Sequence, residues 1–597
     1  MKTRTRVLPV LLLLLLVVGV FASSAAAVKP PGSSPGPKSP FDDTTQFQPM
    51  PDLPGGFEQS NGEQMRGAHD NGRGGNTFVN DPCLDPAPTQ PEPERRRRTV
   101  QSETEIAVLN TSGSMGKKMV AGWNDSFGFY DREEGLSGYG YSTDGGNTWI
   151  DGGGLPPAVP GRTGTNPDRY FGDPVLVVHH ASQTFYYASI YLTPQGVFTL
   201  SVNRGKFQDA PPQDVESISN TRCANDFSEF GVPDPPQVKR ERIIWEPPVQ
   251  VVTSASLNNG DFLDKEWMYV DQKTGSIYVT YTRFAADGST PIEVSKCMAC
   301  ANSPTFTTGM FGPPTVIVPN EATEFNQATQ PYTTNTGRVI VTWFARSFDG
   351  VGFAESEQRI EYAYSDDDAA TFTPEQLITQ VNPQGEPLGY NRGRATILNA
   401  PYITVDKGED DGTTSRAESS RAGFNNVYVT YFSGKTPLGG VTKAADIFVS
   451  TSTNNGTTFG SPVKVNDDAT NTIHVFPSVQ ANKHGDVYVG WIDRRNDPTN
   501  VLNETWAAVS KSRGATFGHN VTESDVATSW FARADARPNF GDYNSSELLG
   551  FNQFVQIWAD GRFPNLGQAG PSTNPLLRQT TPDTIFGISQ GLGVGGG

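Results

Sequence analysis

Acidic residues, arginines and one tyrosine stand at corresponding ends of the strands that this sequence predicts. Two carboxyls such as Asp173 and Asp542 are enough for general acid/base hydrolysis. A planar guanidinium group binds a carboxylate through two parallel hydrogen bonds. The starts of the innermost strands supply Glu103, Asp173, Asp264, Glu266, Asp542 and Tyr543, and the ends of the following strands supply Asp125, Arg283, Arg346, Asp493, Arg494, Arg495, Asp560 and Arg562. Because buried charges are costly unless they are paired or hydrated, this concentration predicts a polar central cavity.

Strand signals position these residues, and from Gln101 onward they recur in a fixed order. Each repeat has a polar-led inner strand, a strongly β-forming second strand, and a third strand that enters a turn. The second strands are expected at Lys118 to Asp125, Thr184 to Leu192, Ser276 to Phe284, Arg338 to Arg346, Asn426 to Gly434, Asp486 to Arg495 and Phe554 to Arg562. This order predicts an all-β fold, a single β-propeller of four-stranded blades. Seven blades are favoured, and six is the alternative if the second repeat is overcounted.

The turn after the third strand repeats the pattern Ser-x-Asp-x-Gly-x-Thr-aromatic in graded copies. A short Asp, Asn or Ser side chain hydrogen-bonds the backbone ahead of it, glycine supplies a positive φ, and the aromatic ring packs the turn onto the sheet. Its defining residues are Ser142, Asp144, Gly146 and Trp149; Ser365, Asp367 and Phe372; Ser452, Gly456 and Phe459; and Ser510, Gly514 and Phe517. Ser201 to Gly205 is expected to be a degenerate copy, and Cys297 to Cys300 replaces the turn in the third repeat.

These turns resemble the Asp-box of the bacterial neuraminidase repeat, the hallmark of the sialidase superfamily, over roughly residues 101 to 590. The resemblance implies a β-propeller glycosidase whose three arginines bind a sugar carboxylate. In such a site Tyr543 would be the nucleophile, Glu266 its partner and Asp173 the acid/base. The substrate-binding residues would be Arg283, Arg494, Arg562, Asp264 and Asp542. The early Phe/Tyr-Arg-Ile-Pro motif of the family is absent here.

Several of these residues have simpler alternative interpretations. The Asp-Arg pairs in Trp491 to Arg495 and Trp558 to Arg562 are equally well explained as ion pairs that join adjacent blades. The segment from Phe540 to Tyr543 reads as a tight turn that leads into an inner strand. His179 and His180 lack metal-ligand partners in the sequence, so no metal site is expected, and no cofactor-binding motif is present.

The charge of the chain limits the classes of binding partner that we expect. The net charge of −18 argues against nucleic acid and against an anionic membrane surface. The N-terminus has Lys2, Arg4 and Arg6, an apolar run from Val7 to Phe21 and then Ala25 to Ala27, which is typical of a cleaved secretory signal. The expected organisation is a signal peptide (1–27), a Pro/Gly-rich extension (28–100) and a propeller (101–597). Asn76 to Asn80 in that extension is the candidate strand for closing the ring.

The chain has four cysteines, an even number that favours disulfides in an exported protein. Cys297 and Cys300 are expected to pair because they are close in sequence, which leaves Cys83 for Cys223. The resemblance to the sialidase superfamily implies a secreted, monomeric propeller that acts on glycans, with exo-α-sialidase activity as its most specific form. The alternatives are a non-catalytic glycan- or protein-binding propeller, and another glycoside hydrolase or lyase on the same scaffold.

Overall fold

A computed structural model describes the following residues of the chain: 76–79, 101–111, 116–125, 135–158, 168–209, 241–258, 260–319, 324–347, 356–384, 398–407, 423–436, 444–525, 527–529, 541–550, 553–564 and 580–588. The expected signal peptide, most of the extension, Cys83 and Cys223 lie outside these ranges. The fold belongs to the unit Arg66–Gly597. Within the described residues, no helix is both long enough and apolar enough to cross a membrane.

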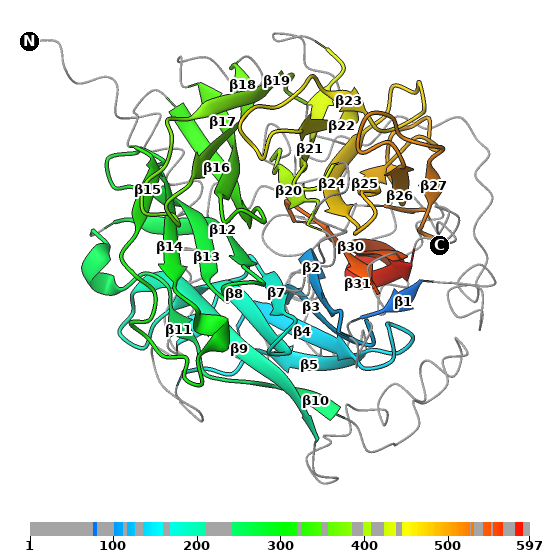
Figure 1. The fold of residues 1–597 in the computed structure, drawn as a ribbon. Helices are drawn as coiled ribbons and strands as arrows, with labels where there is room; N and C mark the ends of the chain where they lie inside the picture. The colour runs from blue at the N-terminus through cyan, green and yellow to red at the C-terminus, as the bar shows by residue number, and fades with distance from the viewer. Residues whose placement is uncertain are drawn as a thin grey trace, which may run out of the picture. The chain divides into compact units, whose positions relative to one another are not determined.

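The described strands form seven sheets, the number of repeats that the sequence favours, and the all-β propeller is confirmed (Figure 1). The first sheet contains β2 (Gln101–Leu109), β3 (Lys118–Asp125), β4 (Ser137–Ser142) and β5 (Ile150–Gly154). The second contains β6 (Arg169–Tyr170), β7 (Val175–His179), β8 (Thr184–Leu192), β9 (Phe198–Asp209), β10 (Glu241–Trp245) and β11 (Val249–Gln250). The third contains β12 (Phe262–Val270), β13 (Ile277–Phe284), β14 (Ile292–Cys297) and β15 (Thr315–Val318).

The remaining four sheets follow the same order. The fourth contains β16 (Glu324–Thr333), β17 (Val339–Ser347), β18 (Gln358–Ser365) and β19 (Gln376–Val381). The fifth contains β20 (Tyr402–Val405), β21 (Val427–Gly434), β22 (Ala445–Ser452) and β23 (Val463–Lys464). The sixth contains β24 (His474–Ala481), β25 (Val487–Asp493), β26 (Leu502–Ser510), β27 (Val521–Thr522) and β28 (Thr528–Ser529). The seventh contains β29 (Ser545–Leu549), β30 (Gln553–Pro564), β31 (Thr580–Ile588) and β1 (Thr77–Phe78), and two short 3-10 helices, η4 (Ser254–Ser256) and η5 (Cys300–Asn302), lie in loops.

The sheets form a closed ring. The inner strand of each sheet contacts the inner strand of the next, from β2 through β7, β12, β16, β20 and β24 to β29, which returns to β2. The last sheet is completed from the other end of the chain, because Thr77 pairs with Phe586 and Phe78 with Ile585 in an antiparallel register. The closing strand expected at Asn76 to Asn80 is therefore present, and it leaves the outer edge of the last sheet paired.

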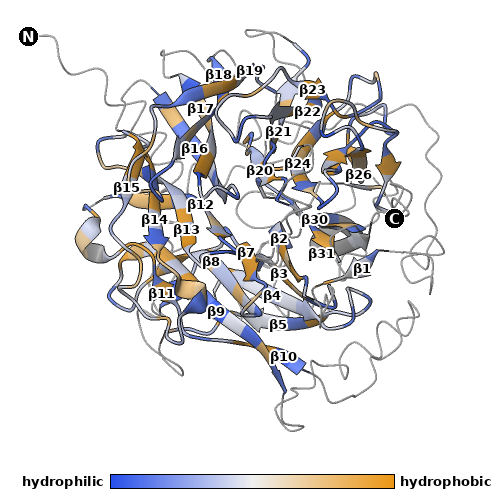
Figure 2. Ribbon diagram, in the orientation of Figure 1, coloured by the Kyte–Doolittle hydropathy of each residue, from blue (hydrophilic) through white to orange (hydrophobic). Residues whose placement is uncertain are grey.

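The core lies between neighbouring sheets. Figure 2 shows hydrophobic stretches on strands such as β7 and β13 and hydrophilic stretches on others such as β10. Trp123, Trp343 and Trp491 occupy the second strands of the first, fourth and sixth sheets and are 1% exposed or less. These tryptophans fill the wedge between blades, which is why the second strands carry the strongest β-forming sequence.

The repeated turns share one hydrogen-bond pattern. In the first turn the Ser142 hydroxyl accepts a bond from the Gly146 N–H at 2.9 Å, and an Asp144 oxygen accepts one from the Thr148 N–H at 2.9 Å. The same pair of bonds recurs in the turns that begin at Ser365, Ser452 and Ser510. Ala369 replaces the glycine in the second of these turns and keeps its left-handed conformation, with φ 63°.

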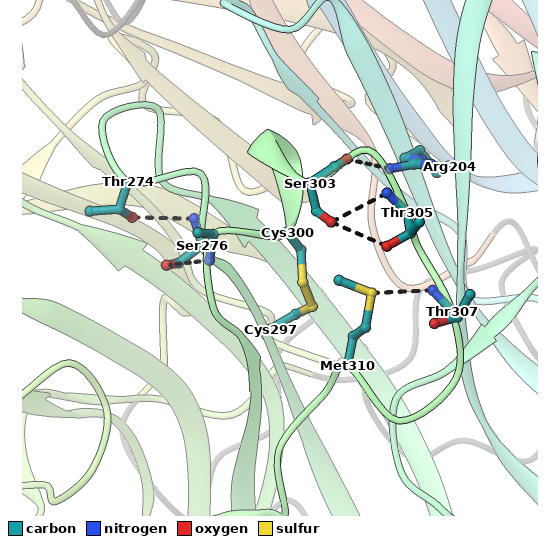
Figure 3. Close-up of a disulfide and its surroundings, with 10 residues drawn as sticks. Arg204, Thr274, Ser276, Cys297, Cys300, Ser303, Thr305, Thr307 and Met310 are labelled. Atoms are coloured by element: carbon teal, nitrogen blue, oxygen red, sulfur yellow. Dashed lines mark hydrogen bonds between the residues drawn. A yellow bond between two sulfur atoms is a disulfide. The ribbon is translucent and has the colours of Figure 1, made fainter.

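Two other repeats depart from this turn. Ser201 to Gly205 does not form a turn, so that expectation is wrong: the segment lies inside β9, which continues outward to pair with β10. In the third repeat Cys297 and Cys300 form the expected disulfide, with Cα atoms 5.7 Å apart (Figure 3). The Ala299 N–H donates to the Ser276 hydroxyl at 3.2 Å, and Arg204 of β9 donates to the Ser303 carbonyl at 2.9 Å. The disulfide therefore clamps a turn that also ties the second and third sheets together.

Candidate functional site

The inner strands carry a repeated irregularity near their starts. The register shifts between Ser102 and Glu105 in β2 and between Asp264 and Trp267 in β12, and equivalent shifts occur in β16 and β24. Within the first two shifts Glu103 and Lys265 have left-handed backbones, with φ 51° and 49°. Non-glycine residues rarely adopt this conformation, and β-bulges of this kind turn a side chain out of the regular alternation.

Asp173 has the same left-handed backbone, with φ 55°, just before β7. Gly541, just before β29, is also left-handed, and a Cβ atom there would come within 2.5 Å of the Glu103 N atom. Glycine is thus required at Gly541 both by its conformation and by this close approach. The bulges and this glycine together bring side chains from the first, second, third and seventh sheets to one end of the ring axis.

The result is a group that we call the axial carboxyl cluster: Glu103, Asp173, Asp264, Glu266 and Asp542 around Lys265. The Lys265 Nζ lies 2.9 Å from Glu103 Oε1, 3.1 Å from Asp173 Oδ1 and 2.9 Å from Asp542 Oδ2. All six residues are buried, with 8% or less of their surface exposed. Five carboxyl groups therefore share a single cation, which is an unusual balance for a protein interior.

Polar neighbours hold the cluster in place. Asn124 of β3 donates to Glu103 Oε2 at 2.8 Å and accepts a bond from the Asp173 N–H at 3.0 Å. Gln327 of β16 donates to Asp264 Oδ2 at 2.7 Å. Glu266 differs, because neither of its carboxyl oxygens has a hydrogen-bond partner among the described residues.

The electrostatics of the cluster favour retained protons. Burial, with the added charge of Asp173, raises the pKa of Glu103 well above its usual value, although Lys265 opposes this. Burial likewise raises the pKa of Asp173, of Asp264 and of Glu266. Burial alone would lower the pKa of Lys265, but the charges of Asp173, Asp542 and Glu103 outweigh it and raise that pKa well above its usual value. The lysine is therefore a fixed cation, and burial favours the neutral form of the surplus carboxyls.

Tyr543 borders the cluster without reaching a carboxylate. Its hydroxyl donates to the Pro174 carbonyl at 2.9 Å, and its ring packs against Trp267 at a centroid distance of 5.1 Å. The Lys265 Nζ lies 5.7 Å from the ring centroid. Burial raises the pKa of Tyr543 well above its usual value, and the nearby carboxylates of Glu103 and Asp173 add to this. In this arrangement the hydroxyl is protonated and already engaged.

The expected arginine triad is placed differently from the carboxyls. Arg283 is held inside its own sheet by Glu293, with Nη2 2.7 Å from Oε2, and by Asp261 at 2.9 Å. Arg494 is fully buried and donates to Asn503 at 2.7 Å and to the Asn500 carbonyl, and burial lowers its pKa to about 9. Arg562 lies in β30, but its side chain is outside the described residues. The structure thus gives Arg283 and Arg494 partners in their own loops and strands.

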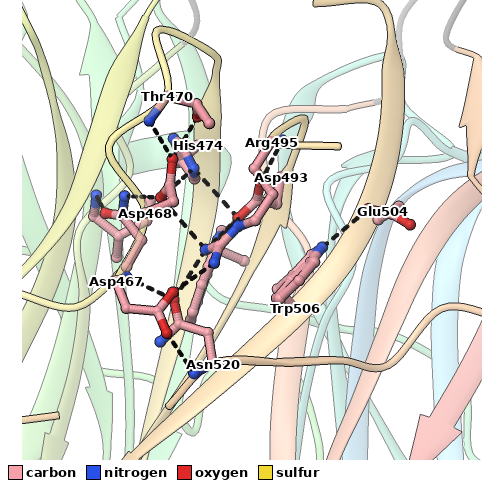
Figure 4. A network of polar contacts seen from close by, with 12 residues as sticks. Asp467, Asp468, Thr470, His474, Asp493, Arg495, Glu504, Trp506 and Asn520 are labelled. Atoms are coloured by element: carbon pink, nitrogen blue, oxygen red, sulfur yellow. Dashed lines mark hydrogen bonds and ion pairs between the residues drawn. The ribbon is translucent and has the colours of Figure 1, made fainter. Parts of the chain in front are cut away.

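A second charged group occupies the boundary between the fifth and sixth sheets, and we call it the interblade network: Asp467, Asp468, His474, Asp493 and Arg495 (Figure 4). Arg495 contacts Asp493 at 2.8 Å and Asp467 at 2.6 Å, and its guanidinium stacks 4.1 Å from the Trp506 ring centroid. The His474 Nε2 lies 3.1 Å from Asp468 and 3.3 Å from Asp493. The interpretation of the segment from Trp491 to Arg495 as ion pairs between adjacent blades therefore fits the structure, because Arg495 pairs with both Asp493 and Asp467.

Sequence reasoning located most of the carboxyl cluster but missed its centre. Lys265 stands between Asp264 and Glu266, and a basic residue flanked by two acids at the start of an inner strand is the signal that could have found it. Asn124 and Gln327 were missed as well, because nothing in their local sequence distinguishes them from other polar strand residues.

Known proteins resemble this chain in fold only at low similarity. No family model matches it, and no curated protein matches it in sequence. A protein of unknown function from Dyadobacter fermentans shares 14% identity over 70% of this chain and 94% of its own, with a TM-score of 0.36. An α-L-arabinanase from Penicillium chrysogenum, solved with arabinobiose, shares 10% identity over 86% and 97%, with a TM-score of 0.39. A Hadza microbial sialidase shares 10% identity over 76% and 73%, with a TM-score of 0.36.

Proposed function

We propose that this protein is an exported glycoside hydrolase that uses carboxyl groups of the axial carboxyl cluster. The observation that carries the proposal is the convergence of five carboxyls from four sheets on Lys265, at the end of the ring axis. Glycoside hydrolysis requires one carboxyl that holds a proton at neutral pH and a second that is ionised. The cluster offers both, because burial raises the pKa of Glu103 and Asp173 while Lys265 supplies a compensating positive charge.

Asp173 is the best candidate for the acid/base. Its side chain is 10% exposed, more than those of Glu103 at 3% or Asp542 at 0%. The Asp173 and Asp542 oxygens both contact Lys265 Nζ, at 3.1 and 2.9 Å, so they lie no more than about 6 Å apart. Retaining glycosidases place their carboxyls about 5 to 5.5 Å apart, whereas inverting ones need about 6.5 Å or more. Of the two mechanisms, the retaining one is compatible with this upper limit.

The same charges select the substrate class. An anionic sugar would meet a single cation that three carboxyls already contact, and every ionised carboxyl in the described part of the site would repel it. Arg283 and Arg494 are engaged elsewhere. A neutral glycan is therefore the favoured substrate, and exo-α-sialidase chemistry is the more specific alternative. That alternative needs the Tyr543 hydroxyl to leave the Pro174 carbonyl and act as the nucleophile, with Glu266 as its partner.

A second candidate function is a non-catalytic glycan- or protein-binding propeller. The observation in its favour is that the cluster is nearly inaccessible, since Lys265 is 8% exposed and bridges three carboxylates. Under this interpretation the cluster joins blades around the axis, and ligands bind at the surrounding loops.

The test is hydrolysis of aryl glycosides by the mature protein. The panel contains aryl α-L-arabinofuranoside, neutral aryl pyranosides and an aryl α-sialoside, with Asp173→Asn, Tyr543→Phe and the matched surface control Asp366→Asn. We expect wild-type protein to release the aryl alcohol from a neutral glycoside. Asp173→Asn should lower kcat/KM at least about 100-fold, and Tyr543→Phe should lower it less than about tenfold. Azide should restore turnover to Asp173→Asn.

The contrary outcomes separate the alternatives. Release from the sialoside alone, abolished by Tyr543→Phe, would establish the sialidase assignment. If wild-type protein hydrolyses no glycoside in the panel, or if Asp173→Asn keeps full activity, the carboxyl mechanism is wrong. The non-catalytic binding propeller then becomes the better interpretation.

A further inference from the structure

The ring axis contains a second feature, a cavity on the other side of an aromatic layer from the axial carboxyl cluster. The inner strands of all seven sheets line it, and their lining residues include Glu105, Val178, Trp267, Gln330, Tyr402 and Ser546. Its volume is ≈ 130 Å³. Because one strand from every blade contributes, the cavity lies on the axis itself rather than between two blades.

The aromatic layer separates the two ends of the axis. Trp267 packs edge-on against Tyr402 at a centroid distance of 5.0 Å and against Tyr543 at 5.1 Å. Tyr543 lies beneath Lys265 of the carboxyl cluster, whereas Trp267 and Tyr402 line the cavity. A ligand in the cavity therefore meets Trp267 and Tyr402 at the end nearest the cluster.

The cavity contains a buried hydrogen-bond donor that is not used. Gln330 is 2% exposed, and its Oε1 accepts a bond from the Ile403 N–H at 3.1 Å. That bond fixes the orientation of the amide, yet Nε2 has no partner among the described residues. An unsatisfied buried donor costs about 1 to 3 kcal/mol, so such a group in a cavity calls for a bound acceptor.

Glu105 provides a complementary group in the same cavity. It is 6% exposed, and its carboxyl is hydrogen-bonded by Ser545, by the Ile106 N–H and, at a longer distance of 3.5 Å, by the Tyr402 hydroxyl. Burial raises the pKa of Glu105 well above its usual value, although a bond from Ser545 opposes this. A protonated carboxyl both donates and accepts. A ligand hydroxyl, which also donates and accepts, would complement this carboxyl.

Two further aromatic rings and one cation line the cavity. Tyr269 and Tyr332 stack with centroids 4.1 Å apart, and Lys407 Nζ lies 4.8 Å and 5.1 Å from their ring centroids. Lys407 also donates to Thr333 at 3.0 Å. Flat aromatic faces beside a few fixed polar groups are typical of small-molecule sites.

From these features we propose that the axial cavity is a binding site for the ring of a neutral monosaccharide, distinct from the axial carboxyl cluster. A sugar hydroxyl can accept from Gln330 Nε2 and exchange hydrogen bonds with Glu105, while the ring faces pack on Trp267 and Tyr402. The volume of ≈ 130 Å³ is below the ~150 Å³ of a cavity that binds one benzene molecule, so it excludes a glycan chain. The site does not depend on the proposed hydrolase activity.

Saturation-transfer NMR on the full mature protein tests this site. The probes are methyl β-D-galactopyranoside, methyl α-D-glucopyranoside and L-arabinose, each titrated to obtain a Kd. Gln330→Glu keeps the acceptor for the Ile403 N–H and deletes the free amide donor, and Glu105→Leu removes the carboxyl that donates and accepts. We expect at least one probe to bind wild-type protein and both variants to bind it at least about tenfold more weakly.

Glu103→Gln is the matched control at the other end of the axis, and it should keep the Kd at this site whatever it does to hydrolysis. The measured Kd therefore tests this site even if the protein hydrolyses no glycoside. Thermal unfolding of each variant shows whether it is folded, and a loss of binding in both folded variants supports the site. No binding of any probe to wild-type protein, or an unchanged Kd in either folded variant, means that the cavity holds only water and overturns the proposal.

Discussion

The axial carboxyl cluster and the interblade network use the same residue types with opposite results. In the network, His474 and Arg495 balance the carboxylates of Asp467, Asp468 and Asp493. Burial works to raise the pKa of Asp493, but hydrogen bonds and charge from His474 and Arg495 outweigh it and lower that pKa. In the cluster Lys265 faces five acids, and burial raises the pKa of Glu103, Asp173, Asp264 and Glu266.

The ratio of cations to carboxylates distinguishes the interblade network, which is structural, from the axial carboxyl cluster, which is the candidate reactive group. Where cations match carboxylates, the carboxylates stay ionised and join two blades. Where carboxyls outnumber cations in a buried place, some keep a proton at neutral pH, which is the state that acid catalysis needs. The strained backbones at Glu103, Asp173 and Lys265 fit the second case, because strain of this kind concentrates at functional sites.

Removing the cation should have the largest effect. Lys265→Met leaves Glu103, Asp173 and Asp542 without their shared partner, and we expect a loss of about 3 to 5 kcal/mol in the free energy of unfolding at pH 7. Urea denaturation measures it. The control is Lys511→Met, which breaks an exposed pair with Asp486 and should cost at most about 1 kcal/mol. Equal effects of the two substitutions would show that the cluster is not held by Lys265.

The interblade network should make stability fall at alkaline pH. Burial opposes it, but bonds and charge from Asp468 and Asp493 raise the pKa of His474 from 6.5 to about 9. The stabilisation is therefore fully present below pH 6.5 and lost as the pH rises through about 9. We expect a decrease on the order of 2 to 3 kcal/mol across that window in wild-type protein. His474→Gln should lack it, and a flat profile in both proteins would contradict the charged imidazole.

Neutralising one acid in each region gives the sharpest contrast. The pKa of Glu103 is higher in the folded protein than its value of 4.5 in the unfolded chain. The Glu103 carboxyl therefore stabilises the folded state most below pH 4.5, and this stabilisation is lost as the pH rises. Glu103→Gln should therefore stabilise the protein at pH 8, by about 1 kcal/mol. Asp493→Asn should destabilise it, because His474 and Arg495 lose their partner. Thermal unfolding of the two variants at pH 8 compares them, and a shift of the same sign in both would break the distinction.

Tyr543 should show the smallest effect. Its hydroxyl donates a single hydrogen bond to the Pro174 carbonyl, so Tyr543→Phe should cost about 1 kcal/mol of unfolding free energy. The ring contact with Trp267 is kept. A loss of several kcal/mol in urea denaturation would indicate that the hydroxyl has further partners in the folded protein.

The fold was largely predictable because its repeats are local. The strands expected at Lys118 to Asp125 and Thr184 to Leu192 coincide with β3 and β8, and the Ser-x-Asp turns form from residues within five positions of one another. The inner-strand starts were also placed correctly near the axis, since blade geometry fixes them. The charge balance there was not predictable, because Lys265 is recognised as the hub only when four sheets are brought together.

The arginines show the opposite failure. Arg283 and Arg494 end equivalent strands, which suggested that they converge on the axis. Their guanidinium groups instead find nearby partners, Glu293 and Asn503, in the adjoining strands of their own sheets. Strand position specifies where a Cα atom lies, whereas the direction of a long side chain follows the partners that the fold supplies.

The most direct test of the account is infrared difference spectroscopy of the carboxyl groups at pH 7. The spectrum of Glu103→Gln is subtracted from that of wild-type protein, and Asp493→Asn is treated in the same way. If the axial carboxyl cluster keeps a proton, Glu103→Gln removes intensity from the C=O stretch of protonated carboxylic acids. Asp493→Asn should instead remove intensity from the carboxylate bands. Loss of carboxylate intensity alone in Glu103→Gln and in an equivalent Asp173→Asn measurement would contradict it, because the axial cluster would then hold no proton on either residue.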